Sequence, residues 1–193
     1  QRGLVIGSQT FGKGTVQSMI PMQHGKLKLT QAKFYRISGA STQHKGVIPD
    51  IGLPALENPQ KIGESTLAAA LQWDEIKPIK HPIILNLQQA VPYLQQRQSE
   101  RSMQDPDFSY TRKLIAKNKL ASAALSLNQQ TRQTHKLAKE NWHLETLNEL
   151  RQAKDMETIS TLHDHIAPKY EPANDPYLQA SGQVLADMIN LMQ

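Results

Sequence analysis

A lysine that lies between two glycines is the residue of this sequence best suited to chemistry. The run Gly7-Ser-Gln-Thr-Phe-Gly-Lys13-Gly-Thr comes close to the phosphate-binding pattern G-x-x-x-x-G-K-[ST], and a short apolar stretch precedes it. Position 14 is a glycine, so the hydroxyl group that holds magnesium in that pattern is absent. Pro21 follows soon afterwards, where the pattern requires a helix to receive the phosphate. The run therefore does not favour nucleotide binding.

Lys13 has a second possible use, as a general base. Glycines on both sides let the backbone come close to another segment and confine the side chain. Burial disfavours the charged form of a lysine, and a neutral amine can take the proton of a serine hydroxyl in a Ser-Lys dyad. A surface lysine on a hairpin has the same spacing, so the residues alone leave both interpretations open.

Other nucleophiles and metal ligands form weaker patterns. The chain has no cysteine, which excludes disulfides, thiolate zinc sites and a cysteine nucleophile. His163 and His165 are the one close pair of histidines, and two residues that are two apart on a helix point to different sides. We therefore expect no metal site and no cofactor.

The composition changes along the 193 residues, which predicts two regions of different architecture. Residues 1–56 carry seven lysines and arginines against one acid, whereas residues 57–193 carry 15 basic and 16 acidic residues. Nine of the ten glycines lie at or before Gly63. A basic strand face that includes Tyr35 could suggest nucleic acid, but no recognised motif accompanies it, and we expect a solvated face and no nucleic-acid partner.

The first region has the pattern of β-structure. A short apolar run at residues 4–6, a mixed run at 15–20 and a strictly alternating run at 26–30 predict strands, and residues 33–37 predict one more. Gly25 favours a hairpin turn between the second and third of these runs.

The second region has helical composition and spacing. Helices are expected over residues 64–73, 86–101, 109–121, 129–154 and 176–192. Asp105-Pro106 and Asp175-Pro176 are typical helix starts, with Asp at the N-cap and Pro at the first position, and Ser126 with Gln129 fits a capping box. The chain has no apolar stretch near the 20 or so residues that a transmembrane helix needs, and we expect no signal peptide within it.

Several segments together resemble the C-terminal processing (tail-specific, Prc-like) serine proteases. The most specific are Gly12-Lys13-Gly14-Thr15-Val16-Gln17 and the run Lys-Gly-Val-Ile-Pro-Asp-Ile that ends at residue 51. Further similar segments are residues 4–7, Phe11, residues 34–36 and 41–44, and then residues 71–74, 105–108, 126–128 and 175–178, which look like the helical extension of the larger members. The resemblance runs nearly from end to end.

The resemblance implies a serine-type endopeptidase with a Ser-Lys dyad that cleaves proteins with nonpolar C-terminal tails. Lys13 matches the general base of the family, and Gln17 matches the glutamine that helps to orient the dyad. Ser8, Ser18 and Ser41 do not match the nucleophilic serine, which lies upstream of the lysine segment in this family. We therefore expect a C-terminal fragment that carries the base without the nucleophile and is inactive alone.

The implied fold class is α/β plus all-α. Residues 1–56 would be the β-rich C-terminal part of the protease core, and residues 57–193 a helical C-terminal domain. The implied partners are protein or peptide substrates with apolar C-termini and a lipoprotein adaptor, in a bacterial periplasm or cell envelope, with at most a peripheral membrane association. A non-catalytic helical binding or scaffold module, in which Lys13 is a relic, is the alternative.

Overall fold

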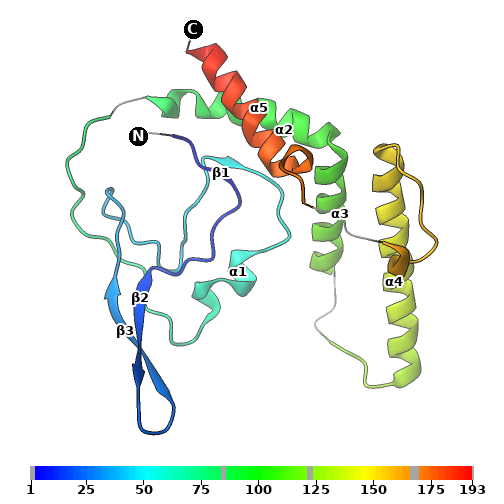
Figure 1. Ribbon diagram of the computed structural model, residues 1–193, viewed down its shortest axis with the longest axis horizontal. Coiled ribbons are helices and arrows are strands. Elements are labelled where there is room, and N and C mark those ends of the chain that lie inside the picture. Colours follow the sequence, from blue (N-terminus) through cyan, green and yellow to red (C-terminus); the bar gives the residue numbers. More distant parts are fainter. Residues whose placement is uncertain (1–2, 84–85, 121–123, 166–169, 193) are drawn as a thin grey trace. The chain divides into compact units, whose positions relative to one another are not determined.

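Two compact units make up the computed structural model, which describes residues 3–83, 86–120, 124–165 and 170–192. One unit contains Gln1–Leu53 and Glu57–Pro92, and the other contains Pro54–Leu56 and Tyr93–Gln193. The first unit holds the short strands and the second holds long helices (Figure 1). The expected mixture of β-rich and helical regions is therefore present, while the expected domain boundary after residue 56 stays a prediction.

Parallel pairing joins the two ends of the first 53 residues. Strand β1 (Ile6–Gly7) pairs with β4 (Ile51–Gly52), with Ile6 opposite Ile51. Val5 and Asp50 strengthen this pairing, since the Val5 N–H donates to the Asp50 carboxylate at 2.8 Å and the Asp50 N–H donates to the Val5 carbonyl at 2.8 Å. Ile51 is completely buried and Leu53 nearly so. The pair thus fixes where the chain enters the loop that contains Lys13.

A long antiparallel hairpin follows that loop, as the alternating residues and Gly25 predict. Strand β2 (Thr15–Pro21) pairs with β3 (Lys26–Lys33), with Pro21 opposite Lys26. Gly25 has a φ of +97°, which the turn requires and which glycine adopts without strain. The register shifts between Val16 and Gln17, so the strand is irregular near its base.

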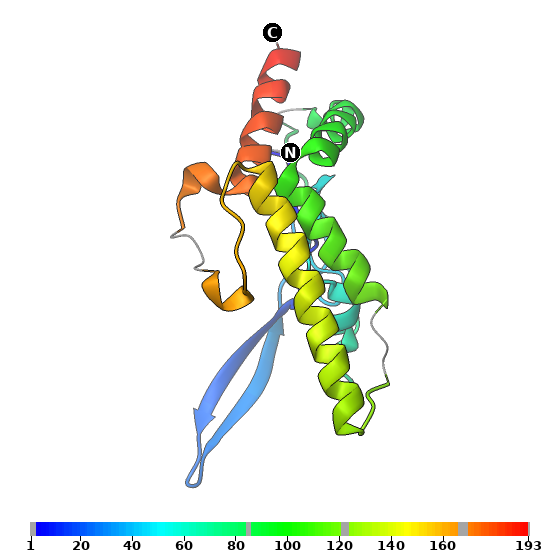
Figure 2. The same ribbon diagram turned by 90° about the vertical axis from the view of Figure 1, so that its right-hand side faces the viewer.

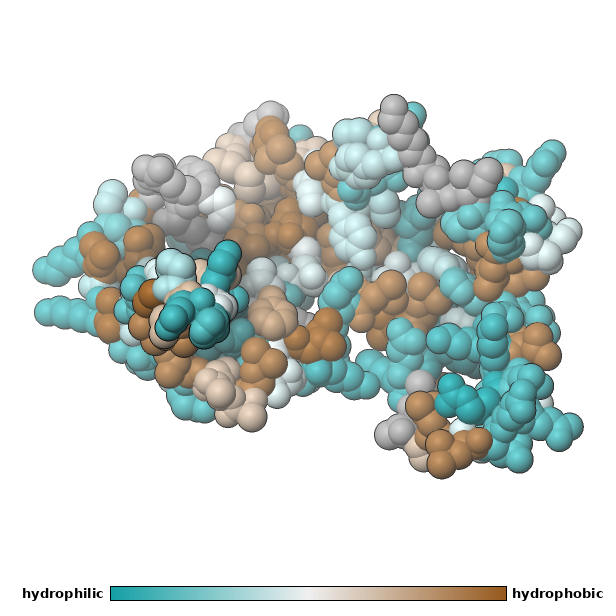
Figure 3. Space-filling view, turned by 60° about the horizontal axis from the view of Figure 1, so that its bottom comes forward, coloured by the Kyte–Doolittle hydropathy of each residue, from teal (hydrophilic) through white to brown (hydrophobic). Residues whose placement is uncertain are grey.

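The hairpin exposes apolar as well as polar side chains. Met19, Ile20, Met22, Leu27 and Leu29 are all exposed. Figure 3, in which the hairpin comes toward the viewer, shows apolar surface interleaved with hydrophilic surface there. Both strands of this two-stranded sheet also leave an outer edge unpaired among the described residues.

The further strand expected over residues 33–37 is wrong. Beyond the end of β3 the described residues form two isolated bridges, Tyr35 with Ser41 and Ala40 with Glu75, and just the first of them involves the expected strand. Gly39, with a φ of +85°, turns the chain back, and its N–H donates to the Arg36 carbonyl at 2.8 Å. Residues 36–39 therefore form a tight turn, in the place where the sequence pattern predicted the end of a strand.

The helix expected over residues 64–73 is also wrong. A short helix α1 (Pro59–Ile62) ends before this segment, and one 3-10 turn (Glu64–Thr66) forms its start. Farther on, the Asp74 carbonyl accepts from Ser41 N–H at 3.2 Å, and the Ile76 N–H donates to Gly39 at 2.9 Å. The backbone leaves the helical conformation at Leu67, which has a φ of −82° and a ψ of 125°, and these bonds tie the residues after the segment to the preceding loop.

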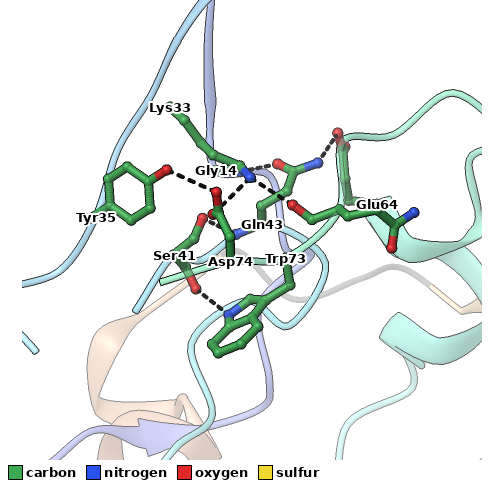
Figure 4. Close-up of polar contacts among 9 residues, drawn as sticks. Gly14, Lys33, Tyr35, Ser41, Gln43, Glu64, Trp73 and Asp74 are labelled. Atoms are coloured by element: carbon green, nitrogen blue, oxygen red, sulfur yellow. Dashed lines mark hydrogen bonds and ion pairs between the residues drawn. The ribbon is translucent and has the colours of Figure 1, made fainter. Parts of the chain in front are cut away.

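Side chains anchor the same segment to the base of the hairpin (Figure 4). Lys33 Nζ donates to the Gln72 carbonyl at 2.6 Å and to the Asp74 carboxylate at 2.8 Å, and the Tyr35 hydroxyl donates to the other Asp74 oxygen at 3.1 Å. The Trp73 indole N–H donates to the Ser41 carbonyl at 3.0 Å. Residues 72–74 thus lie against the loop that begins at Ser41.

The second unit is helical, and its two Asp-Pro helix starts match the capping signals of the sequence. Its longer helices are α2 (Val91–Gln104), α3 (Pro106–Leu120), α4 (Gln129–Ala153) and α5 (Pro176–Leu191). The Asp175 carboxylate accepts from Tyr177 N–H and Leu178 N–H, so the Asp-Pro start of α5 is confirmed. The N-cap of α4 is Asn128, which accepts from Thr131 N–H, and not the Ser126 of the expected capping box.

Apolar contacts within the second unit bring its helices together. Helices α3 and α4 lie side by side (Figure 2). Leu94, Phe108, Leu147 and Val184, one from each long helix, are buried. Arg101 of α2 also donates to the Asp187 carboxylate of α5 at 2.6 Å. None of the helices in the described ranges is long and apolar enough to cross a membrane.

We expect the bonds that Asp74 accepts from Lys33 and Tyr35 to make the free energy of unfolding depend on pH. The hydrogen bond from Lys33 is the main reason why the pKa of the Asp74 carboxyl lies below its ordinary value. A carboxyl group whose pKa is lower in the folded state stabilises that state above its unfolded pKa, and this contribution is lost as the pH falls through the folded pKa. Asp74→Asn should therefore lower the free energy of unfolding at neutral pH, and the deficit should shrink at acid pH.

Urea unfolding of the chain and of the Asp74→Asn variant between about pH 7 and about pH 2 measures this difference. Asp155→Asn, which alters a carboxylate in the other unit, is the control. If Asp74→Asn lowered the free energy of unfolding by the same amount at every pH, the stabilising role of the charged Asp74 carboxylate would be contradicted.

Candidate active site

Close packing of two loops places Lys13. A Cβ atom at Gly12 would lie 2.6 Å from the His44 carbonyl oxygen, and one at Gly14 would lie 2.5 Å from the Gln43 nitrogen. Both distances are too short for any side chain, so the two glycines permit the close backbone approach that the sequence suggests. Gly12 also has a φ of +95°, which disfavours other residues. The backbone on both sides of Lys13 is thereby fixed against residues 43–44.

The loop of residues 43–47, which packs against the Lys13 loop, is also closely packed. Gly46 has a φ of +63°, and a Cβ atom there would lie 2.3 Å from the Thr10 carbonyl oxygen. Thr10 and Val47 are joined by two hydrogen bonds, of 3.1 and 2.8 Å. The Lys45 ammonium group lies 3.3 Å from the centre of the Trp73 ring, so residues 72–74 cover this loop from another side.

The Lys13 side chain is partly exposed and has two polar neighbours. Its Nζ donates to Thr15 Oγ1 at 2.9 Å and lies 3.7 Å from Glu64 Oε1. The side chain is 39% exposed, so a group from outside the described residues can reach the amine. Lys13 is therefore held at its backbone while its amine stays accessible.

Gln17 lies on β2, just after the irregularity in the strand. Its Nε2 donates to Thr30 Oγ1 of β3 at 3.1 Å. The structure therefore places Lys13 and Gln17 at the same end of the hairpin but gives their side chains different partners, Thr15 with Glu64 for one and Thr30 for the other. The catalytic roles of both residues stay predictions.

Sequence reasoning missed two buried residues beside Lys13, namely Gln43 and Glu64. The Gly14 N–H donates to Gln43 Oε1 at 2.7 Å, and Gln43 Nε2 donates to Glu64 Oε1 at 3.1 Å (Figure 4). Gln43 is 0% exposed and Glu64 is 6% exposed. No local pattern marks a buried amide or carboxylate of this kind, since its partners are 21 and more residues away in the sequence.

Two of the three serines that the sequence analysis compares with the nucleophile, Ser18 and Ser41, already have hydrogen-bond partners. The Ser18 hydroxyl donates to Gln31 Oε1 across the hairpin at 2.7 Å. Ser41 is buried, and its Oγ accepts from the Gln43 N–H at 3.0 Å. Ser8 is exposed in the loop before Lys13. This arrangement supplies a candidate base, and it does not bring one of these hydroxyls to the Lys13 amine.

The histidine pair lies in the second unit. His163 belongs to a 3-10 turn (Leu162–Asp164), and His165 ends it. Within the described ranges, no three histidine, aspartate or glutamate side chains gather in a way that could hold a metal ion.

Comparison with known protein families gives two adjacent matches. Residues 58–190 match the family described as the C-terminal domain of tail specific protease, and residues 1–53 match peptidase family S41. The second match contains Lys13, Gln17 and Gln43, whereas Glu64 and the Trp73-Asp74 anchor belong to the first.

Individual relatives agree with these matches. The tail-specific protease of Haemophilus influenzae is 31% identical over 203 residues, an alignment that covers 98% of this chain and 29% of that protein. The carboxy-terminal-processing protease of Bartonella bacilliformis is 50% identical over 52 residues, which are 26% of this chain and 12% of that protein. The chain thus spans less than a third of the length of either relative. It belongs to the tail-specific protease family and joins a segment of peptidase family S41 to the C-terminal domain of that family.

Proposed function

We propose that this chain is the C-terminal part of a Ser-Lys endopeptidase of the tail-specific type, with Lys13 as the general base. The single observation that carries the proposal is the Lys13 segment itself. It lies within the S41 match, its backbone is fixed by Gly12 and Gly14, and its amine is accessible from outside the chain.

The reaction requires a nucleophile that this proposal places in a preceding part of a longer polypeptide. A neutral Lys13 amine takes the proton of the serine hydroxyl as the oxygen attacks the scissile carbonyl, and then gives the proton to the leaving amine. Backbone N–H groups would have to stabilise the oxyanion that forms. The chain without its nucleophile would be inactive.

Gln17 would orient the amine of Lys13. Its Nε2 donates to Thr30, which leaves the amide oxygen as an acceptor for an N–H group. An amide can fix an amine in this way without adding charge. In the catalytic arrangement that we propose, the Lys13 amine turns from Thr15 toward the amide oxygen of Gln17.

The exposed hairpin supports a longer protease core. Two-stranded hairpins are marginally stable on their own, and β2 and β3 present both open edges and exposed apolar side chains. Additional strands of the same polypeptide would cover these surfaces. The proposed fold is thus a protease core of which residues 1–56 are one part, followed by the helical domain of residues 57–193.

The names of the relatives, tail-specific and carboxy-terminal-processing, suggest the substrates. We extend the proposal to proteins or peptides with nonpolar C-terminal tails. We propose, from the family resemblance, that the enzyme works in a bacterial periplasm or cell envelope, at most peripherally bound to the membrane, and that its helical domain binds a lipoprotein adaptor.

We predict that Lys13→Ala in the full-length polypeptide lowers the rate of cleavage of a protein with an apolar tail by at least about 100-fold, because the general base is lost. Lys13→Arg keeps a cation that does not lose its proton and should be equally inactive. Gel-based cleavage time courses measure the rates, and circular dichroism confirms that each variant is folded.

Normal cleavage by Lys13→Ala would exclude Lys13 as the base. A folded wild type that cleaves no tailed substrate would exclude the protease function, and the non-catalytic binding module would then be the better hypothesis.

We also predict that Gln17→Leu lowers kcat by about 10-fold, since it removes one hydrogen-bonding group that orients the amine. Ser18→Ala is the matched control, because Ser18 makes a comparable bond across the same hairpin to Gln31 and has no role in the reaction. Steady-state kinetics on the same substrate distinguish the two variants. An equal loss of kcat in both would mean that Gln17 acts only by stabilising the hairpin.

A further inference from the structure

Glu64 is a buried carboxylate that the proposed reaction does not use. It begins the 3-10 turn after Gly63, and its N–H donates to the Phe11 carbonyl at 2.9 Å. A carboxylate that is 6% exposed is costly unless hydrogen bonds or opposite charges compensate for its lost hydration. Its partners therefore indicate what it does.

The two partners of Glu64 lead to the same short segment. Oε1 accepts from Gln43 Nε2 at 3.1 Å and lies 3.7 Å from Lys13 Nζ. Gln43 in turn accepts the Gly14 N–H at 2.7 Å. Glu64 Oε1 thus attracts the Lys13 ammonium group directly. Through its hydrogen bond with Gln43, it also holds the Gly14 peptide that follows Lys13.

The connection through Gln43 has little freedom. Gln43 is completely buried, and its own N–H donates to Ser41 Oγ at 3.0 Å. The space for a Cβ atom at Gly14 is filled by the Gln43 backbone. Because both ends of the Gln43 amide are bonded, neither the amide nor the Gly14 peptide can rotate without breaking a buried hydrogen bond.

Lys13 is held more loosely than its backbone. The distance of 3.7 Å to Glu64 is an ion-pair distance and is too long for a hydrogen bond. The carboxylate therefore attracts the ammonium group while leaving it free to move toward another acceptor. The 39% exposure of the Lys13 side chain allows such a movement.

We propose that Glu64 and Gln43 form a clamp that positions Lys13, and that the C-terminal domain supplies part of it. Glu64 lies in the residues that match the C-terminal domain family, whereas Gln43 and Lys13 lie in the S41 segment. The clamp as a device for cleavage depends on the proposed function. Both residues would act on the reaction through Lys13, so both are positioning residues.

Three substitutions in the full-length polypeptide separate the parts of the clamp. Glu64→Gln keeps an oxygen that can accept from Gln43 and removes the charge beside Lys13. Gln43→Leu removes the acceptor of the Gly14 N–H. Glu64→Asp is the conservative variant, which keeps the charge on a shorter side chain. Glu57→Gln is the matched control, because it neutralises an exposed carboxylate only seven residues before Glu64.

Two measurements are made on every variant. Hydrogen–deuterium exchange, read by mass spectrometry, reports the protection of a peptide covering residues 10–17. Steady-state kinetics on a protein with an apolar tail give kcat and KM separately. The exchange measurement does not depend on whether the protein is a protease.

We expect Gln43→Leu to raise exchange in residues 10–17 and to lower kcat by about 10-fold with little change in KM, since tail binding does not involve the clamp. Glu64→Gln should lower kcat with a smaller change in exchange, and Glu64→Asp should recover part of kcat. Glu57→Gln should behave as the wild type.

The outcomes distinguish the clamp from the proposed function. Wild-type exchange and kcat in both Glu64→Gln and Gln43→Leu would overturn the clamp, as would an effect on KM alone. Faster exchange in Gln43→Leu together with no cleavage by the folded wild type would refute the protease function and leave the clamp as a structural contact only.

Discussion

The close contact between residues 10–14 and residues 43–46 is the constraint on which the first unit depends. Gly12 and Gly14 lie so near the backbone of His44 and Gln43 that any side chain at either position would separate the two loops. One of the two loops follows β1 and the other precedes β4, so the parallel pairing of β1 with β4 holds both loops close together. The β2–β3 hairpin begins directly after the first loop. Lys13 owes its backbone position to this contact, while its amine remains accessible.

Buried polar groups complete this arrangement from a part of the chain that follows the strands. Gln43 needs a partner for its amide, and Glu64 supplies it. Lys33 and Tyr35 fix Asp74, and Trp73 bonds to Ser41. A buried amide or carboxylate without partners costs free energy, so the Gln43–Glu64 bond holds the start of this segment against the loops, while the bonds from Lys33, Tyr35 and Trp73 hold residues 72–74. The lysine segment and the beginning of the C-terminal domain therefore form one unit.

The sequence predicted the elements whose signals are local. The hairpin depends on Gly25 and an alternating strand, and the start of α5 depends on Asp175 and Pro176, which are neighbours in the chain. The helix expected at residues 64–73 stops after one 3-10 turn, and long-range bonds of residues 72–76, which no local pattern marks, hold the following backbone against the loops. Lys13 was singled out by its flanking glycines and then, together with Gln17, by the family resemblance. Both lie in the segment that matches peptidase family S41, and their catalytic roles stay predictions. Gln43 and Glu64 could not be found, since burial of a polar side chain depends on residues brought together only by the fold.

Truncation of the full-length polypeptide tests most directly whether residues 57–92 complete the lysine segment. One form ends after Pro92 and the other after Leu56, and hydrogen–deuterium exchange is measured over residues 10–17. We predict that the form ending at Pro92 keeps the slow exchange of the full-length protein, and that the form ending at Leu56 exchanges faster because Glu64, Trp73 and Asp74 are gone. Equally slow exchange in both forms would contradict it.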